Sequence, residues 1–247
     1  MIQYCKKVFI LKVKETWFSH QYKFRNIFTL NVFLHVQNNL DKKKWAIQEN
    51  SHTIELDLLE NEDIIYSNFS KQIRQQSKIS VNEGTNCYFH TDIDQFVSFF
   101  NDFALKKDTY TTSKEVLKGL GNSVCLSFAE NNGQILAAHS YLVDDEIGIV
   151  RHLHSATKRL DEQYDRNLIG RANKYLTVKD ILYFKGLGFK VFDFGGYAKD
   201  TKDESLKGIN NYKLLFGGKI VTCIDYYSYS YWLLKKISKI LGLSGKL

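Results

Sequence analysis

The sequence predicts a mixed α/β (α+β) fold in which helices flank a mixed sheet. Its second half carries three consecutive strand-like runs separated by turn residues, followed by a long helical run and further alternating elements. Its first half alternates strand-like and helical runs. Hydrophobic residues make up 44% of the chain and charged residues 25%, which is typical of a globular protein. The length of 247 residues permits one large domain or two small ones.

The first half begins with runs that favour β-structure. Residues 1–13 and 27–36 are rich in β-branched and aromatic side chains and read as strands. Residues 53–58 alternate polar and apolar side chains, which predicts a half-buried strand. A helix is expected over 61–77, because Asn61 can cap it and apolar residues recur at helical spacing behind that cap.

The middle of the chain gives the clearest pattern. Residues 91–118 have the apolar spacing of a buried helix. Residues 124–129, 135–143 and 147–155 then predict an antiparallel meander, whose first turn over 130–133 has the Asn-Gly chemistry of a tight hairpin.

The end of the chain continues the alternation. Glycines punctuate this region and mark where helices and strands stop. In chain order we expect a helix over 168–185, a strand over 191–194, a short helix over 209–216, a strand over 219–229 and an amphipathic helix over 231–241.

Composition restricts the class of partner and compartment. The net charge of +7 favours anionic partners, although a generally lysine-rich composition gives the same value. The four cysteines (Cys5, Cys87, Cys125 and Cys223) form no CxxC pair and no zinc spacing, so no metal site is predicted. The N-terminal run contains lysines and is not a signal peptide, and no run reaches the roughly 20 apolar residues of a membrane span. These features predict a cytoplasmic protein with reduced thiols and no stable membrane insertion.

Three runs carry a resemblance to a known superfamily. They are Ile169-Gly-Arg-Ala-Asn-Lys-Tyr-Leu176, Phe192-Asp-Phe-Gly-Gly-Tyr197 and Ile209-Asn-Asn-Tyr-Lys-Leu-Leu-Phe-Gly-Gly218. In this order, with the meander before them, they resemble GNAT-superfamily enzymes of surface-polysaccharide gene clusters, which are similar in turn to Fem-type transferases of peptidoglycan bridges. The nearest resemblance is to sugar N-acyltransferases that act on dTDP-linked amino-dideoxyhexoses.

This resemblance implies a specific activity. The chain would be an acyl-CoA-dependent N-acyltransferase that moves a 3-hydroxybutanoyl or acetyl group from coenzyme A to the amine of a nucleotide-linked amino sugar, for O-antigen or capsule synthesis. Residues 54–58, followed by a helix bearing Lys71 and Arg74, resemble the Fem-type pattern more weakly. The chain would then consist of two tandem GNAT-like halves, a degenerate one over 1–90 and an acyltransferase half over 91–247.

The start of the long helix is the expected cofactor site. A helix N-terminus offers unpaired N–H groups to the pyrophosphate of coenzyme A. Gly170 and Ala172 match the GNAT phosphate motif, Arg166 and Arg171 add charge, but Asn167 occupies the first motif position and Arg166 comes one residue early. Small residues that merely pack on the sheet are the alternative.

Two kinds of residue are candidates for the general base. Period-2 alternation puts His152 and His154 on one face of the third meander strand, and histidine has a suitable pKa. Either could instead be solvated or a hydrogen-bonded core residue. Asp193 lies on a short apolar strand, where a carboxylate is costly unless it is paired or used, so it could bind the amine, act as base, or hold the turn of Gly195 and Gly196.

The resembling runs also contain three candidates for substrate binding, Asn173, Tyr197 and Lys213, and one further tyrosine, Tyr212. Asn173 would recognise a polar group, Lys213 a phosphate, and Tyr197 or Tyr212 could protonate the leaving thiolate. His139, in mid-strand, reads as a satisfied core residue.

Two other classes of function stay open. One is a Fem-type transferase that uses aminoacyl-tRNA, against which no inserted helical arm of heptad character is found. The other is a non-catalytic GNAT-like binding protein, although no aromatic-and-basic motif of a nucleic-acid module is present and no nucleic-acid partner is expected. Aromatic residues over 226–232 suggest a possible homodimer.

Overall fold

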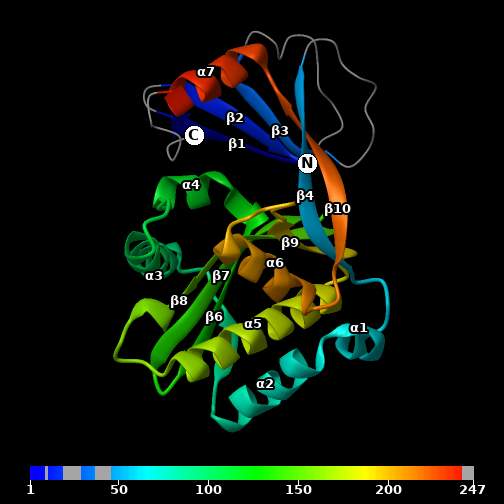
Figure 1. Ribbon diagram of the computed structural model, residues 1–247, viewed down its shortest axis with the longest axis vertical. Helices are drawn as coiled ribbons and strands as arrows, with labels where there is room; N and C mark the ends of the chain where they lie inside the picture. The colour runs from blue at the N-terminus through cyan, green and yellow to red at the C-terminus, as the bar shows by residue number, and fades with distance from the viewer. Residues whose placement is uncertain (9–10, 19–28, 37–45, 241–247) are drawn as a thin grey trace. The chain divides into compact units, whose positions relative to one another are not determined.

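A computed structural model describes residues 1–8, 11–18, 29–36 and 46–240 of the chain (Figure 1). It divides into two compact units, one formed by residues 1–53 with 221–247 and the other by residues 54–220. The boundaries fall inside two strands, β4 (Ile47–Asp57) and β10 (Lys219–Tyr227). The first unit is therefore assembled from the two ends of the chain.

The first unit is a sheet with one helix. β1 (Ile2–Val8) pairs antiparallel with β2 (Leu11–Trp17), and β2 runs parallel to β3 (Asn31–Val36). β3 pairs antiparallel with β10, and α7 (Tyr229–Ile240) follows β10. Val13, Val32, Tyr227 and Tyr231 form its core. The single strand expected over 1–13 is thus two strands, β1 and the first residues of β2. Part of the strand expected over 27–36 lies outside the described residues.

The second unit contains the predicted meander. β6 (Val124–Asn131), β7 (Gln134–Asp144) and β8 (Ile149–Thr157) pair antiparallel in that order, and β9 (Val191–Gly196) runs parallel to β8. β5 (Asn86–Phe89), which the sequence analysis missed, pairs with β6 at one edge, and β4 lies beside β9 at the other. Asn132 and Gly133 have φ angles of 50° and 75°, as the expected hairpin turn requires.

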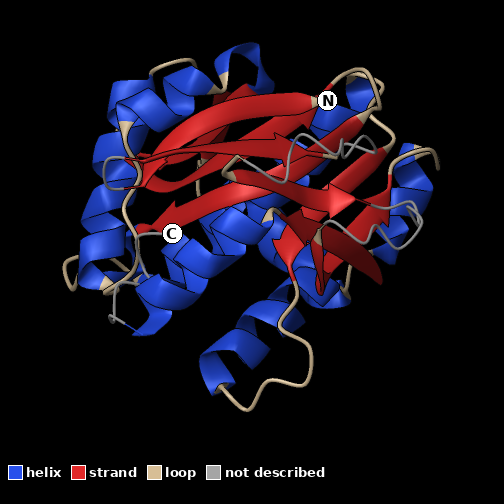
Figure 2. Ribbon diagram, turned by 90° about the horizontal axis from the view of Figure 1, so that it is seen from above, coloured by secondary structure: helices blue, strands red, loops and turns tan. Residues whose placement is uncertain are grey.

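Helices flank this sheet (Figure 2). α5 packs on β6 and β7, whereas α3 packs on β8. In chain order the helices are α1 (Glu62–Asn68), α2 (Lys71–Asn82), α3 (Ile93–Lys106), α4 (Lys114–Gly119), α5 (Arg166–Gly186) and α6 (Glu204–Leu214), with short 3-10 turns over Gly121–Ser123 and Lys158–Leu160.

The two long helices expected in this region are each divided in two. Residues 61–77 break at Phe69 and Ser70, whose backbone is extended, and the Ser70 hydroxyl accepts a hydrogen bond from the Ile73 N–H to begin α2. Residues 91–118 break at Asp108, which has a φ of 52°, and Ser113 caps the second helix. Apolar spacing continues across both breaks, so a capping residue decides where each helix begins.

The element order confirms the predicted fold class. Three antiparallel strands, a helix, a parallel strand, a helix and a final strand follow one another from β6 to β10. The mixed α/β fold with a large mixed sheet flanked by helices is therefore present. The division into two tandem GNAT-like halves at residue 90 stays a prediction, because it concerns a similarity between the halves. The two compact units described above have their boundaries elsewhere, after residues 53 and 220.

Two observations bear on environment. No helix among the described residues has the length and apolar character needed to cross a bilayer. All four cysteines are free thiols, and Cys223 is buried whereas Cys5 is exposed.

Candidate functional site

The candidate site lies where β9 separates from β8 in the second unit. Register pairs between these strands run from Ile149 and Val191 to Arg151 and Asp193. Beyond that point β8 continues to Thr157 along β7, but within residues 46–240 no register pair joins it to β9. Gly195 makes the turn, with a φ of 81°, and a Cβ there would lie 3.0 Å from the carbonyl oxygen of His152. Gly195 therefore lies against the β8 backbone at His152, just past the point where register pairing between the two strands ends.

A β-bulge in β8 determines which side chains face this site. Ser140 is paired with His154 and Tyr141 with His152, so Leu153 is an extra residue without a partner in register on β7. His152 packs against the rings of His139 and Tyr141, whereas His154 bonds to Ser140. The expectation that His152 and His154 share one face is wrong, because the bulge shifts the alternation by one residue.

His154 is enclosed on the α3 face. Its Nδ1 lies 2.7 Å from the Ser140 hydroxyl, and its ring contacts Phe100 at a centroid distance of 4.7 Å. Burial lowers the pKa of His154 to about 4. This environment is that of the hydrogen-bonded core histidine, the alternative to a catalytic role.

His152 is partly exposed on the opposite face. Its Nε2 lies 3.1 Å from the carbonyl oxygen of His154, which can only accept, so Nε2 carries hydrogen and Nδ1 keeps a lone pair. Burial, followed by the charges of His139 and Lys213, lowers the pKa of His152 well below its usual range. His152 is thus a neutral imidazole with a proton-accepting nitrogen at neutral pH.

A buried polar network lies beside His152. Asn173, Thr177 and Asp180 are spaced i, i+4, i+7 on α5 and present one polar stripe to the sheet. His139 Nδ1 lies 2.8 Å from Asp180 Oδ2, and its Nε2 lies 3.0 Å from Asn173 Oδ1. The Tyr141 hydroxyl donates to Asp180 Oδ2 at 2.5 Å. His139 is a satisfied core residue, as expected.

The network extends to α6. Asn173 Nδ2 donates to the Tyr212 hydroxyl at 2.9 Å, and that hydroxyl lies 3.1 Å from Thr177 Oγ1. Burial raises the pKa of Tyr212. Asn173 therefore joins β7 to α6 through its own hydrogen bonds, and Tyr197, half-buried against the apolar core, is not among the residues of this network.

Asp193 pairs with Arg151 at the point where the strands separate. Arg151 forms an ion pair with Asp193 Oδ2, while Asp193 Oδ1 accepts from the Gly195 N–H at 2.7 Å. Both carboxylate oxygens are therefore engaged in holding the turn, which was one of the three alternatives for Asp193. Lys213 donates to the Gly196 carbonyl at 2.6 Å, and burial with the charge of Arg151 lowers its pKa to about 8.

The four expected cofactor residues occupy different environments at the start of α5. Asp165 caps the helix by accepting from the Asn167 N–H at 2.8 Å. Arg171 forms a bidentate ion pair with Glu83, at 2.8 and 2.5 Å, and Ala172 is buried in the core. Arg166 is exposed, and a Cβ on Gly170 would meet nothing within 4 Å. The role of all four residues in phosphate binding stays a prediction. Arg166 and Gly170 are better placed for it than Arg171, which is ion-paired, and Ala172, which is buried.

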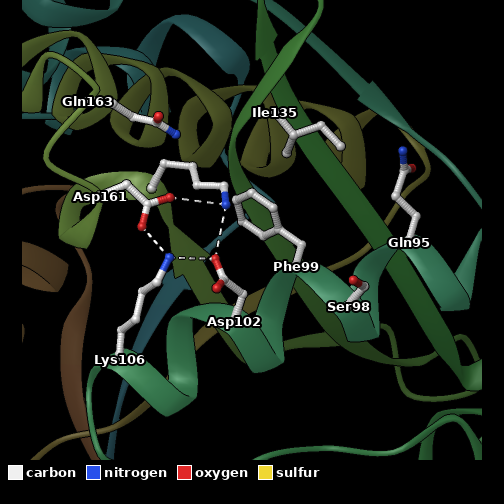
Figure 3. A pocket seen from close by; sticks show the side chains of 9 residues that line it. Gln95, Ser98, Phe99, Asp102, Lys106, Ile135, Asp161 and Gln163 are labelled. Carbon is white, nitrogen blue, oxygen red and sulfur yellow. Dashed lines mark hydrogen bonds and ion pairs between the residues drawn. The ribbon is translucent and has the colours of Figure 1, made fainter.

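A cavity of about 600 Å³ lies between α3 and the segment that precedes α5 (Figure 3). Lys106 and Lys158 alternate around it with Asp102 and Asp161, and both lysines pair with both aspartates. The four charges thus neutralise one another, and none of the residues expected at the site lines this cavity. Its lining residues are Gln95, Ser98, Phe99, Asp102, Lys106, Ile135, Lys158, Asp161 and Gln163.

Sequence reasoning missed several residues of the site. Thr177 and Asp180 interrupt the buried face of a helix that otherwise presents Leu176, Ile181 and Phe184 to the sheet. A polar stripe at i, i+4, i+7 on a buried face was a signal that could have been found. Arg151 carried no such signal, because its partner Asp193 lies 42 residues further along the chain.

Comparison with solved structures finds the same fold. FemX matches with a TM-score of 0.65 and 11% identity, over 95% of this chain and 85% of FemX. The C-terminal domain of an Agrobacterium fabrum protein described as a lysylphosphatidylglycerol synthetase matches with a TM-score of 0.61 and 12% identity, over 88% of this chain and 73% of that one. L-PGS from Bacillus licheniformis matches with a TM-score of 0.57 and 10% identity, over 87% and 73%.

No protein-family model and no curated protein sequence matches the chain significantly. The solved structures are all far below the identity at which activity carries over, so they show a shared fold. The fold of this chain is therefore similar to that of FemX and of the lysylphosphatidylglycerol synthetase domain.

Proposed function

We propose that the protein is a GNAT-type transferase that moves an acyl or aminoacyl group onto an amine at the opening between β8 and β9. One observation carries the proposal. His152, a neutral imidazole whose Nε2–H is held by a backbone carbonyl, stands at the residue where β9 leaves β8 and just before the bulge. A group bound where the two strands part would meet this base directly.

The chemistry follows from these groups. His152 Nδ1 accepts a proton from the acceptor amine, whose nitrogen attacks the acyl carbon of the donor. The resulting tetrahedral oxyanion needs an N–H donor, and the bulge takes Leu153 out of the regular ladder and supplies a candidate. Collapse breaks the bond to the leaving group, a thiolate or an alkoxide, which takes up a proton.

The donor and acceptor are the finer part of the proposal. The resemblance of the three sequence runs favours an acyl-CoA donor, whose phosphates would bind at Arg166 and Gly170, and a dTDP-linked amino-dideoxy sugar as acceptor. Lys213 and Asn173 would then bind polar groups of the acceptor. Because the pKa of Lys213 is lowered to about 8, its amino group is protonated in about half of the molecules in mildly basic solution.

The similarity to FemX favours a second candidate, a Fem-type transfer from aminoacyl-tRNA. Such a donor carries its acyl group as an ester rather than a thioester, and the same base and oxyanion donor would serve it. The net charge of +7 suits either polyanionic donor.

The test is a donor-by-acceptor panel with purified protein. Acetyl-CoA, 3-hydroxybutanoyl-CoA and an aminoacyl-tRNA pool would each be combined with dTDP- and UDP-amino sugars, and thiol release or loss of the aminoacyl ester would be measured. In the productive combination, His152→Gln is expected to lower kcat by about 10²–10⁴-fold, the usual contribution of a general base. His90→Gln, a change of an exposed histidine, is the matched control and should retain full activity.

Each outcome has a distinct meaning. Release that requires one amino sugar supports the acyl-CoA reading, and loss of aminoacyl ester supports the tRNA-dependent one. No transfer and no binding of either donor would overturn the proposal and leave a non-catalytic binding protein.

A further inference from the structure

Two histidine rings lie side by side on the α5 face of the sheet. The centroids of His139 and His152 are 4.5 Å apart, and their planes meet at 57°. His139 is fully buried and has a hydrogen-bond partner on each ring nitrogen. Hydrogen carried by His139 therefore lies next to the neighbouring ring, and the hydrogen-bond partners determine which ring nitrogens can carry it.

The direction of the network fixes one end of His139. The Thr177 hydroxyl donates to the Asn173 carbonyl at 3.0 Å, so its oxygen accepts from the Tyr212 hydroxyl. The Tyr212 oxygen then accepts from Asn173 Nδ2, which leaves Asn173 Oδ1 facing His139 Nε2. An amide oxygen only accepts, so Nε2 of His139 carries hydrogen.

The other end of His139 meets a carboxylate. Its Nδ1 lies 2.8 Å from Asp180 Oδ2, which also accepts from the Tyr141 hydroxyl. A carboxylate accepts both bonds when Nδ1 carries hydrogen as well. Nδ1 also lies 3.2 Å from the Tyr141 hydroxyl, which donates to the same carboxylate oxygen. Hydrogen on both nitrogens would make His139 an imidazolium paired with Asp180 in the interior.

We propose that His139, held as an imidazolium by Asp180 and Asn173, is a positioning residue that keeps His152 in its neutral, proton-accepting form. A second positive charge 4.5 Å from His139 would be strongly disfavoured in this partly buried place. The proposal rests on the proposed role of His152 as base. In this proposal the polar stripe of α5 influences the charge state of His152 through His139.

Other groups also act on His152 and must be kept constant in a test. Lys213 on α6 and His154 on β8 disfavour its protonation, in the same direction as His139. Arg151 on β8 is neutralised by Asp193 on β9, and Asp180 on α5 is bonded to His139. The phenol ring of Tyr141 on β7 also contacts the His152 ring.

The first experiment uses the unmodified protein without substrate. Nitrogen-15 NMR of histidine-labelled protein at pH 7 should show hydrogen on both ring nitrogens of His139. For His152 it should show hydrogen on Nε2 and a bare Nδ1. A bare Nδ1 on His139 would overturn the proposal. Because no turnover is needed, this result is independent of whether the proposed transfer occurs.

A variant then tests the action on His152. Asp180→Asn replaces the carboxylate by an amide that can donate to His139 Nδ1, so His139 becomes neutral. The protonation midpoint of His152 should rise by about one pH unit, the scale expected for removing a charge at this distance. Asp63→Asn is the matched control, because it removes an exposed carboxylate on α1 and leaves the network unchanged.

The outcomes separate a structural role from a positioning role. A folded Asp180→Asn protein with an unchanged His152 midpoint would refute the proposal, as would an equal rise in Asp63→Asn. Should Asp180→Asn fail to fold, the nitrogen-15 spectrum of the unmodified protein decides the question alone.

Discussion

The turn at Gly195 gives a prediction whose size can be worked out from the structure. Gly195→Ala puts a Cβ on a residue with a φ of 81°, 3.0 Å from the carbonyl oxygen of His152. The left-handed backbone costs an alanine about 1–2 kcal/mol, and the close contact adds a packing cost of about 1–3 kcal/mol. Reduced freedom of the unfolded chain offsets about 0.4–1 kcal/mol. The expected net loss in free energy of unfolding is about 1–5 kcal/mol.

The neighbouring residue supplies the matched control. Gly196 is exposed, and a Cβ there would meet nothing within 4 Å. Gly196→Ala should therefore leave stability unchanged or raise it by up to about 1 kcal/mol. Urea denaturation of both variants, followed by circular dichroism, compares them through the midpoint at constant m-value.

The same pair reports on the site. Relief of the contact in Gly195→Ala displaces the His152 carbonyl, so the loss of transfer activity should exceed that of Gly196→Ala. Equal stability of the two variants would refute the view that β8 and Gly195 are in tight contact. Unequal stability with equal activity would refute the view that this contact positions the site.

Three further predictions address other parts of the second unit. Gly170→Ala adds a Cβ in open space inside α5 and should stabilise the fold by about 0.5–1 kcal/mol, yet weaken acyl-CoA binding if a phosphate lies there; calorimetric unfolding and titration measure the two effects. Ser70→Ala removes the cap of α2 and should cost about 1 kcal/mol in urea denaturation. Because the pKa of His154 falls to about 4 on folding, the unfolded chain binds a proton first, so stability should fall by about 3 kcal/mol as pH drops from about 6.5 to about 4.

Each of these has an outcome that contradicts it. Unchanged acyl-CoA affinity in a stabilised Gly170→Ala protein would contradict the prediction that a phosphate binds at the start of α5. An unaltered midpoint in Ser70→Ala would mean that packing, not the cap, begins α2. A flat stability profile between pH 6.5 and 4 would mean that His154 is not desolvated; His152, whose pKa is also lowered, contributes with the same sign.

Local patterns predicted much of the second unit. The meander over β6–β8, the turn at Asn132 and Gly133, and the long helix α5 follow from alternation, turn chemistry and apolar spacing. The order of elements and three short runs were enough to indicate the GNAT-like fold. These features depend on residues close together in the chain, which is why they can be predicted from a single sequence.

Features that depend on distant residues were not predictable in the same way. The first unit combines residues 1–53 with 221–247, and no local pattern indicates that union. The ion pair of Arg151 with Asp193, and that of Arg171 with Glu83, join separate elements. Arg171 consequently turned out to be engaged in an ion pair, although its position at the start of α5 suggested a phosphate ligand.

The bulge at Leu153 has a consequence for how such sites change in evolution. Because the strand alternates with a period of two, removing Leu153 would leave His154 opposite Ser140 and His152 opposite Tyr141, on opposite faces of the sheet. One residue inserted into β7 between Ser140 and Tyr141 would instead pair with Leu153, restore unbroken alternation and turn both histidines to the same face. A single-codon insertion in β7 could therefore exchange a buried imidazole for an accessible one without altering either side chain. The face on which each histidine lies, and so the chemistry open to it, depends on the register of β8 with β7 rather than on the spacing of the histidines in the sequence.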